Sequence, residues 1–178
     1  MARRPIRCSS PIFSSTAISG GLEPVADLIV RPAIRADLDL WLPLWAGYNA
    51  FYGRSGDTAL APEITAATWE RFFDPYEPMF ALVAEQDGAL LGLTHYLLHR
   101  STTSLLPSLY LQDLFTSVEA RGNGVGRALI EAVYRAAQER SLPRVYWQTH
   151  ETNETAMALY DRIAEKSGFL VYRKQLPA

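Results

Sequence analysis

Three glycines within five residues lie between a run of strand-forming residues and a long amphipathic segment. The run Gly122-Asn123-Gly124-Val125-Gly126 is flanked by Arg121 and Arg127. Without side chains in the way, the backbone N–H groups of such a turn can approach an anion, and a following helix adds the positive end of its dipole. A phosphate or pyrophosphate is the natural ligand of this arrangement. A tight turn without a ligand would use the same glycines.

Two common phosphate-binding motifs do not fit these glycines. A Walker loop requires Lys and then Ser or Thr after its last glycine, and here Arg127 and Ala128 follow Gly126. The dinucleotide-binding fingerprint G-x-G-x-x-G follows the first strand of a βαβ unit. Here the spacing is G-x-G-x-G, and the turn follows the third strand of a hairpin region. The sequence therefore argues against both of these nucleotide-binding classes.

Hydrophobic periodicity divides the chain into a hairpin region followed by alternating strands and helices. Asp87-Gly88 is a favoured hairpin turn between two strand-forming runs. Asp37 can cap a helix whose aromatic residues recur at helical spacing. The predicted strands cover residues 28–31, 80–85, 89–98, 109–116, 145–149 and 169–175, and the predicted helices cover about 37–52, 62–73, 124–140 and 153–166. This order predicts an α/β (α+β) fold in which helices cover a mixed sheet.

Composition limits the function classes. The chain has 178 residues, 48% of them hydrophobic, which suits one domain with its own core. The net charge of -2 is unlike the basic surface of nucleic-acid-binding proteins. Cys8 alone cannot form an internal disulfide, and no Cys/His cluster has the spacing of a zinc site. No run approaches the ~20 apolar residues of a membrane span. We expect a cytoplasmic protein with no metal, nucleic-acid partner or membrane anchor.

The N-terminal segment differs from the rest of the chain. Residues 1–26 are rich in Ser, Gly, Pro and Arg and lack sustained periodicity. This composition is typical of a flexible arm. We therefore expect an arm over residues 1–26 and a single domain over residues 27–178.

The glycine turn and a later segment together resemble the GNAT superfamily of N-acetyltransferases. Arg121-x-x-Gly124-x-Gly126 is similar to the R/Q-x-x-G-x-G/A acetyl-CoA loop of those enzymes, and the preceding strand is similar to theirs. The segment from Asn153 to Tyr160 resembles their N-x-x-A-x-x-L-Y pattern, and Gly168-Phe169 resembles their terminal G-F. Residues 147–161 and the aromatic first helix are most similar to the subgroup of fungal histone, polyamine and D-amino-acid acetyltransferases.

This resemblance implies a mostly antiparallel, twisted sheet of six to seven strands, with helices on both faces and a splayed central strand. It implies acetyl-CoA as cosubstrate and an amine acceptor, either a small molecule or a peptide. A homodimer is expected from the family alone. The residues that the resemblance places against the coenzyme are Leu114, Phe115, Thr116, Arg121, Gly122, Asn123, Gly124, Val125, Gly126, Arg127, Asn153, Ala156 and Tyr160.

Acetyl transfer to an amine requires a neutral nucleophile, a polarised thioester carbonyl and a proton for the departing thiolate. The resemblance implies that backbone N–H groups of residues 114–116 polarise the carbonyl and that Tyr160 is the general acid. Asn153, Ala156 and Tyr160 share a helix face, and the small Ala156 leaves room for a cofactor. The alternative is that Tyr160 is a core aromatic residue beside Leu159.

The catalytic base is less well defined, with Gln112 and Asp113 as candidates. Spermidine/spermine N-acetyltransferases carry Glu-Asp where this chain has Gln112-Asp113. Gln112 cannot accept a proton, so Asp113 remains as a base, or as an anchor for a cationic substrate. Strand alternation places the two on opposite faces unless a bulge intervenes. A role for Asp113 in orienting the backbone is the structural alternative. His95 is expected to be packed or solvent-facing.

Two function classes therefore remain open. The first is an N-acetyltransferase acting on a polyamine, an amino acid or a lysine side chain. The second is a non-catalytic sensor or partner module that binds acyl-CoA on the same fold, because a fold does not imply a function. The intact Asn153 and Tyr160 favour the enzyme.

Overall fold

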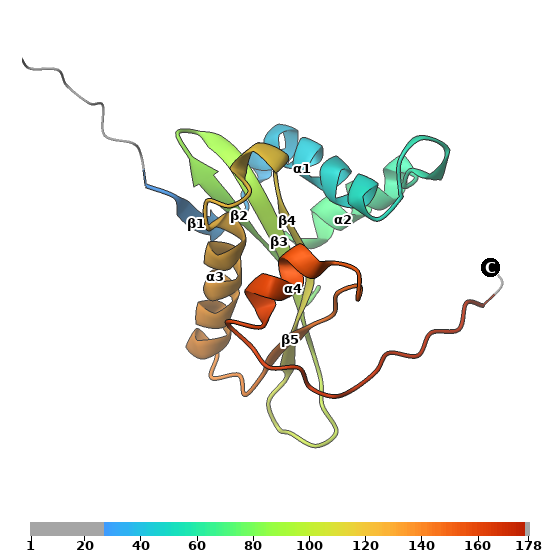
Figure 1. Ribbon diagram of the computed structural model, residues 1–178, viewed down its shortest axis with the longest axis vertical. Coiled ribbons are helices and arrows are strands. Elements are labelled where there is room, and N and C mark those ends of the chain that lie inside the picture. The colour runs from blue at the N-terminus through green and yellow to red at the C-terminus, as the bar shows by residue number, and fades with distance from the viewer. Residues whose placement is uncertain (1–26, 177–178) are drawn as a thin grey trace, which may run out of the picture.

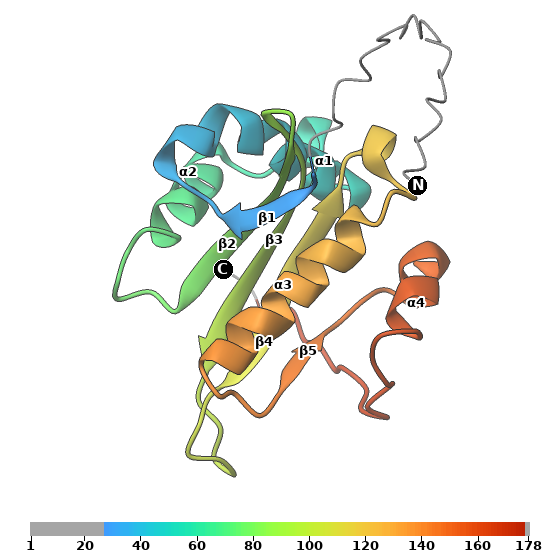
Figure 2. The same cartoon turned by 90° about the vertical axis from the view of Figure 1, so that its left-hand side faces the viewer.

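A computed structural model describes residues 27–176, so the predicted arm over residues 1–26 lies outside the described residues. The strands are β1 (Ile29–Pro32), β2 (Met79–Gln86), β3 (Ala89–His99), β4 (Ser108–Thr116) and β5 (Val145–Trp147). The helices are α1 (Leu38–Phe51), α2 (Pro62–Arg71), α3 (Val125–Glu139) and α4 (Glu154–Tyr160), with single 3-10 turns at Arg35–Asp37, Gly56–Thr58 and Val118–Ala120. The helices α1 and α2 cover one face of the sheet, and α3 covers the other (Figures 1 and 2).

The strands lie in the order β1-β2-β3-β4-β5, and every pair is antiparallel except β4–β5. The β2–β3 hairpin closes at Asp87 and Gly88, with φ of 52° and 76°. A type I′ turn requires these two positive φ angles. The parallel β4–β5 pair needs a crossover, which α3 supplies. The predicted mixed, mostly antiparallel sheet with helices on both faces is confirmed.

The predicted strand at residues 169–175 is wrong. These residues form no strand, so the sheet has five strands rather than six or seven. Phe169, Leu170 and Tyr172 are 79–91% exposed, and the segment extends away from the sheet after α4 (Figure 1). A strand-forming composition yields a strand only where a neighbour supplies backbone partners and packing. Within the described chain, this segment lacks such a neighbour.

An aliphatic layer fixes α3 on its face of the sheet. Val125, Leu129 and Val133 recur every four residues, Ile130 lies three residues before Val133, and all four are at most 2% exposed. This spacing places them on one stripe of the helix. They pack with Leu109 and other residues of the strands in one cluster, which fixes the start of α3 beside the end of β4.

An aromatic layer fills the opposite face. Trp41 and Trp45 of α1 have ring centroids 5.4 Å apart, and Trp41 lies 4.9 Å from Trp69 of α2. Trp41 is fully buried. Large aromatic rings contribute about 2–3 kcal/mol each when buried. Most of the aromatic stripe predicted for this helix is therefore core, and it anchors α1 against β3.

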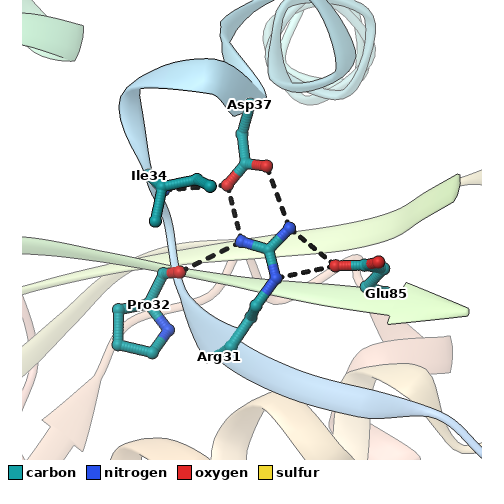
Figure 3. A network of polar contacts seen from close by, with 5 residues as sticks. All are labelled: Arg31, Pro32, Ile34, Asp37 and Glu85. Carbon is teal, nitrogen blue, oxygen red and sulfur yellow. Dashed lines mark hydrogen bonds and ion pairs between the residues drawn. The ribbon is translucent and has the colours of Figure 1, made fainter. Parts of the chain in front are cut away.

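An ion-pair network joins β1 to the start of α1 (Figure 3). Both oxygens of the Asp37 carboxylate accept hydrogen bonds from Arg31, at 2.7 and 2.9 Å, and one oxygen also accepts from the Ile34 N–H at 2.8 Å. Arg31 donates in addition to Glu85 of β2. The Arg31 hydrogen bonds hold the pKa of Asp37 below its usual range. Because its carboxylate is engaged here, Asp37 occupies the N-cap position of α1 without capping the helix through its side chain.

Candidate active site

A bulge in β4 decides where its polar residues point. His95 of β3 lies opposite Asp113, but the next residue, Tyr96, lies opposite Leu111, so Gln112 is an extra residue in the ladder. A bulge of this kind reverses the alternation of side chains. Leu111 packs in the α3 layer, whereas Asp113 binds His95 on the face that α1 covers. Gln112 is exposed between them.

The strands β4 and β5 separate after a short ladder. Only residues 109–111 of β4 pair with residues 145–147 of β5, whereas β4 continues to Thr116 along β3. In the described chain, the other edge of β4 therefore lacks a strand partner from Gln112 to Thr116. Every second residue of a strand turns its N–H and C=O toward such an edge. The result is the splayed strand expected from the sequence, with polar backbone groups facing the gap.

A cleft of about 570 Å³ opens where the two strands diverge. Its walls come from β4, the glycine turn, the start of α3, α4 and the end of α1. Every site residue predicted from the sequence lines it except Asp113 and Asn123. Residues that line the cleft outside that predicted set include Tyr48, Phe51, Tyr52, Trp147, Gln148, Thr155, Ala158, Leu159 and Arg162.

The glycine turn forms one end of this cleft. Gly122 and Gly124 both have φ of 82°, and Gly124 is the N-cap of α3. This left-handed conformation costs other residues about 1–2 kcal/mol, which explains why glycine stands at both positions. No side chain caps α3, so the free amides of its first turn keep their hydrogen-bonding capacity for a ligand. The exposed Arg121 and Arg127 add positive charge on either side.

Tyr160 is the last residue of α4 and lines the cleft. Its ring packs edge-on against Trp147 of β5, with centroids 5.3 Å apart. Burial raises the pKa of Tyr160 to about 12, with a smaller effect from the nearby Tyr52. The hydroxyl therefore stays protonated at neutral pH. Within residues 27–176 it has no hydrogen-bond partner, so it is free to donate to a ligand in the cleft.

Asn153 and Ala156 stand on the same side of α4 as Tyr160, as the two-turn spacing predicts. Both line the cleft, and Asn153 is the N-cap residue of α4. Its side-chain amide donates to the Thr149 hydroxyl at 3.1 Å. This bond ties the start of α4 to the segment that leaves β5. The helix ends at Tyr160, earlier than the predicted residue 166.

Asp113 lies behind the cleft wall, at the end of a buried chain of polar groups. The Trp41 indole N–H donates to His95 Nε2 at 3.0 Å, and His95 Nδ1 is 2.9 Å from an Asp113 oxygen. All three residues are at most 7% exposed. An indole N–H can only donate, so His95 Nε2 accepts, and the imidazole proton resides on Nδ1 and points to Asp113. This network assigns a neutral imidazole that donates to Asp113.

Two tyrosines of α1 connect Asp113 to the cleft. Tyr48 lies close enough to Asp113 that this carboxylate, together with burial, raises the Tyr48 pKa far above its usual value. Burial also raises the pKa of Tyr52, with a smaller effect from Asp113. The rings of Tyr48 and Tyr52 pack edge to face, with centroids 5.2 Å apart. The end of α1 thus lines the cleft.

Sequence reasoning missed the partners of Asp113. His95 was expected to be packed or solvent-facing, and it is packed, but its two ring nitrogens hold Trp41 and Asp113. The pairing depends on the register of β3 against β4, which the bulge at Gln112 shifts. A hydrophobic pattern contains no signal for that shift.

Within residues 27–176, no group of three or more His, Cys, Asp and Glu side chains is arranged to hold a metal ion. None of the helices described there is both long and apolar enough to cross a membrane.

Comparison with known proteins agrees with this geometry. Residues 41–164 match the Acetyltransferase (GNAT) family. The chain is 36% identical over 153 residues to the D-amino-acid N-acetyltransferase HPA3 of Saccharomyces cerevisiae, covering 84% of this chain and 92% of that protein. It is 29% identical over 151 residues to the uncharacterized N-acetyltransferase YhfO of Bacillus subtilis, covering 84% and 98% of the two chains.

Solved structures share the fold. A probable acetyltransferase superimposes with a TM-score of 0.71 at 26% identity, covering 84% of this chain and 97% of that one. The aminoglycoside N-acetyltransferase AAC(6')-Iy in complex with CoA superimposes with a TM-score of 0.70 at 18% identity, covering 86% and 99%. The family match extends over most of the described residues and includes β4, the glycine turn and α4. The chain is an N-acetyltransferase of the GNAT family, whose members use acetyl-CoA as the acetyl donor.

Proposed function

We propose that this enzyme transfers the acetyl group of acetyl-CoA to a primary amine by direct attack inside the cleft. One observation carries the proposal: the uncapped start of α3, the open edge of β4 and the Tyr160 hydroxyl all face the same cleft. The start of α3 is an anion site for the diphosphate. The edge of β4 is a row of backbone donors for the pantetheine arm and the thioester carbonyl, and the hydroxyl is an acid for the sulfur.

The cleft fits coenzyme A along its length. The free amides at the start of α3, with Arg121 and Arg127 beside them, would hold the diphosphate. The extended pantetheine arm would lie along the free edge of β4 in the manner of an added strand. The coenzyme supplies the activated thioester. The protein's N–H groups at residues 114–116 would polarise its carbonyl, because fixed dipoles stabilise the charge that develops on the oxygen.

Tyr160 would act as the general acid toward the departing sulfur. Its pKa of about 12 keeps the phenol protonated, whereas a thiol has a pKa of about 8.5. Full transfer to a thiolate is therefore uphill at equilibrium. Tyr160 instead donates a hydrogen bond that strengthens as negative charge develops on the sulfur, and it regains any proton that it releases. Gln112 lines the cleft nearby and can hydrogen-bond but cannot accept a proton.

Asp113 would serve the amine side of the reaction. Its carboxylate lies behind Tyr48 rather than on the cleft surface, so it acts on the acceptor through that hydroxyl or through its negative charge. An alkylamine is mostly protonated at neutral pH, because its pKa is about 10.4. A buried anion beside the cleft attracts such a cation, and its carboxylate can act as the base that accepts the proton.

The proposed acceptor is a primary amine that carries an apolar part. HPA3, which shares 36% identity with this chain, is named for acetylation of D-amino acids, so amino acids belong with polyamines and lysine peptides among the acceptors to test. The aromatic wall formed by Tyr48, Phe51 and Tyr52 favours an acceptor with an apolar part next to its amine.

Release of the coenzyme thiol tests the proposal. Purified full-length protein is incubated with acetyl-CoA and a panel of amino acids, polyamines and lysine peptides, and free thiol is followed with a chromogenic disulfide. We expect amine-dependent release above the rate without amine. Saturable binding of acetyl-CoA by calorimetry, with no release for any amine, would instead indicate a sensor or partner module.

A further inference from the structure

Trp41, His95 and Asp113 form a buried network of polar groups that core packing alone does not require. A core position of this size is normally apolar, because burying polar groups gives little net stabilisation even when they are hydrogen-bonded. Here an imidazole that is 1% exposed and a carboxylate that is 7% exposed are buried together under α1. Tyr48 lies beside Asp113 and also lines the cleft. One end of the network is therefore buried and the other reaches the acceptor side of the site.

We propose that Tyr48 is a catalytic residue that carries the acceptor's proton to Asp113, and that His95 and Trp41 are positioning residues that keep Asp113 ready to receive it. This inference rests on the proposed function, because it concerns the amine side of the same cleft. A tyrosine hydroxyl can accept one hydrogen bond while it donates another. Tyr48 can thus accept from the amine in the cleft and donate to Asp113 behind it.

The neutral amine attacks the carbonyl carbon, a C–N bond forms, and the C–S bond breaks with its electron pair leaving on the sulfur. The nitrogen proton passes to the Tyr48 oxygen while the Tyr48 proton passes to Asp113. The departing sulfur accepts a hydrogen bond from the Tyr160 hydroxyl. When products leave, water removes the proton from Asp113 and supplies one to the coenzyme thiolate, so the net reaction consumes and releases no proton.

Trp41 defines the direction of the relay. Its N–H donates to His95 Nε2 at 3.0 Å, which requires the imidazole proton to be on Nδ1, where it donates to Asp113 across 2.9 Å. Asp113 thereby receives a hydrogen bond from His95, and its carboxylate lies beside Tyr48. Its backbone is held as well, since the Thr94 hydroxyl donates to the Asp113 carbonyl oxygen at 2.9 Å. The bulge at Gln112 places the carboxylate on this face of the sheet.

Charged and titratable groups around Tyr48 support this direction of transfer. The Arg54 guanidinium lies 5.6 Å from the Tyr48 ring and 5.4 Å from the Tyr52 ring, and its Nε donates to the buried Asn49 at 2.7 Å. The positive charge of Arg54 offsets part of the raising effect of burial and Asp113 on the Tyr48 pKa. Tyr48 therefore remains a protonated hydroxyl beside a carboxylate acceptor.

Tyr48→Phe is the direct test, with thiol release measured on the full-length enzyme at saturating acetyl-CoA and amine. The variant keeps the ring and its stacking on Trp45 but removes the hydroxyl. We expect kcat to fall about 100-fold, while acetyl-CoA affinity and melting temperature stay near wild type. Tyr96→Phe, in the buried layer on the opposite face, is the matched control and should retain wild-type kcat.

Substitutions of His95 separate positioning from packing. A glutamine amide can donate to Asp113 and accept from Trp41 as the imidazole does, whereas leucine fills space without either bond. We expect His95→Gln to keep kcat within about 10-fold of wild type and His95→Leu to lose about 100-fold, with acetyl-CoA affinity unchanged in both.

Two results would overturn the relay. Wild-type kcat in Tyr48→Phe, with Tyr160→Phe impaired in the same assay, would remove Tyr48 from the chemistry and leave the proposed function intact. Equal kcat for His95→Gln and His95→Leu would show that His95 only fills space. If the wild-type enzyme released no thiol with any amine, the proposed function itself would fail.

Discussion

Gln112 is the extra residue in the β4 ladder, and it determines on which face of the sheet its neighbour Asp113 lies. In a regular strand without the bulge, Asp113 would alternate onto the same face as Leu111, inside the aliphatic layer beneath α3. With the bulge, Asp113 lies under α1, hydrogen-bonded to His95 and beside Tyr48. Gln112 itself lines the cleft with an uncharged side chain. The two adjacent residues therefore have different roles, and their substitutions should have different effects.

Asp113→Asn should lower kcat about 100-fold, because the amide cannot accept the proton that leaves the amine. Gln112→Ala should keep kcat within about 3-fold of wild type, because it removes only a hydrogen-bonding group. Thiol release at saturating substrates measures both. A larger loss for Gln112→Ala than for Asp113→Asn would contradict these assignments.

Asp37 should make the free energy of unfolding depend on pH. Arg31 lowers the Asp37 pKa in the folded protein, so its stabilisation is complete above the unfolded value of about 3.9 and is lost as the pH falls through the lower folded value. Asp37→Asn should cost about 2 kcal/mol of unfolding free energy at neutral pH and less at low pH.

Urea unfolding of both proteins between about pH 7 and pH 2.5 measures this dependence. Asp39→Asn, in the exposed first turn of α1, is the control and should cost under about 0.5 kcal/mol. An Asp37→Asn deficit that stayed constant down to the lowest pH would contradict the assignment.

Residues that line the cleft were predictable where a local motif defines them. Gly124 lies in the predicted glycine turn and Tyr160 in the predicted helix, which ends at Tyr160 rather than at residue 166, and both line the cleft. Asp113 was identified as a candidate, but its partners were not, because they come from α1 and β3, far away in sequence. Side chains brought together by register and by tertiary packing leave no short-range signal.

The start of α3 is the element on which coenzyme binding depends. The aliphatic stripe of α3 fixes the helix against the sheet, and the uncapped first turn faces the cleft. The helix and its glycine turn were predictable because periodicity and backbone conformation act locally. The extents of β5 and α4 were overestimated, by two and by six residues respectively, since both ends depend on the divergence of β5 from β4.

Gly124→Ala tests this element against a matched control. Gly124 and Gly88 both have a positive φ, of 82° and 76°, and an added Cβ would touch nothing within 4 Å at either position. Each alanine should therefore cost about 1–2 kcal/mol of unfolding free energy from backbone strain alone. Only Gly124→Ala should weaken coenzyme A binding, by about 10-fold in calorimetry, because Gly88 does not line the cleft. Equal affinities would argue against the glycine turn as the diphosphate site.

At the scale of the whole molecule, the cleft exists because both faces of one sheet contribute to it, and different helices cover the two faces. The α3 side presents the anion site, the α1 side presents Tyr48 and Asp113, and the divergence of β4 from β5 opens the space between them. The fold class followed from the order of elements. The strand count did not, because residues 169–175 have strand-forming side chains without an adjacent edge in the described chain.

The homodimer expected from the family stays a prediction, and the C-terminal segment gives it a physical basis. Phe169, Leu170, Val171 and Tyr172 expose apolar surface together, which is typical of a protein contact. Sedimentation of the full-length protein should give twice the 19.9 kDa chain mass. Replacing Phe169 and Val171 by serine should shift the protein toward the monomer. A wild-type protein that sediments as a monomer at all concentrations would contradict the prediction.

The central claim is that the cleft between β4 and α4 carries out acetyl transfer with Tyr160 beside the reacting sulfur. Its most direct test compares kcat for thiol release in wild type and Tyr160→Phe, with acetyl-CoA affinity measured on the same preparations. We predict that kcat falls about 100-fold while the dissociation constant changes by less than about 2-fold. Equal kcat values for the two proteins would contradict the account.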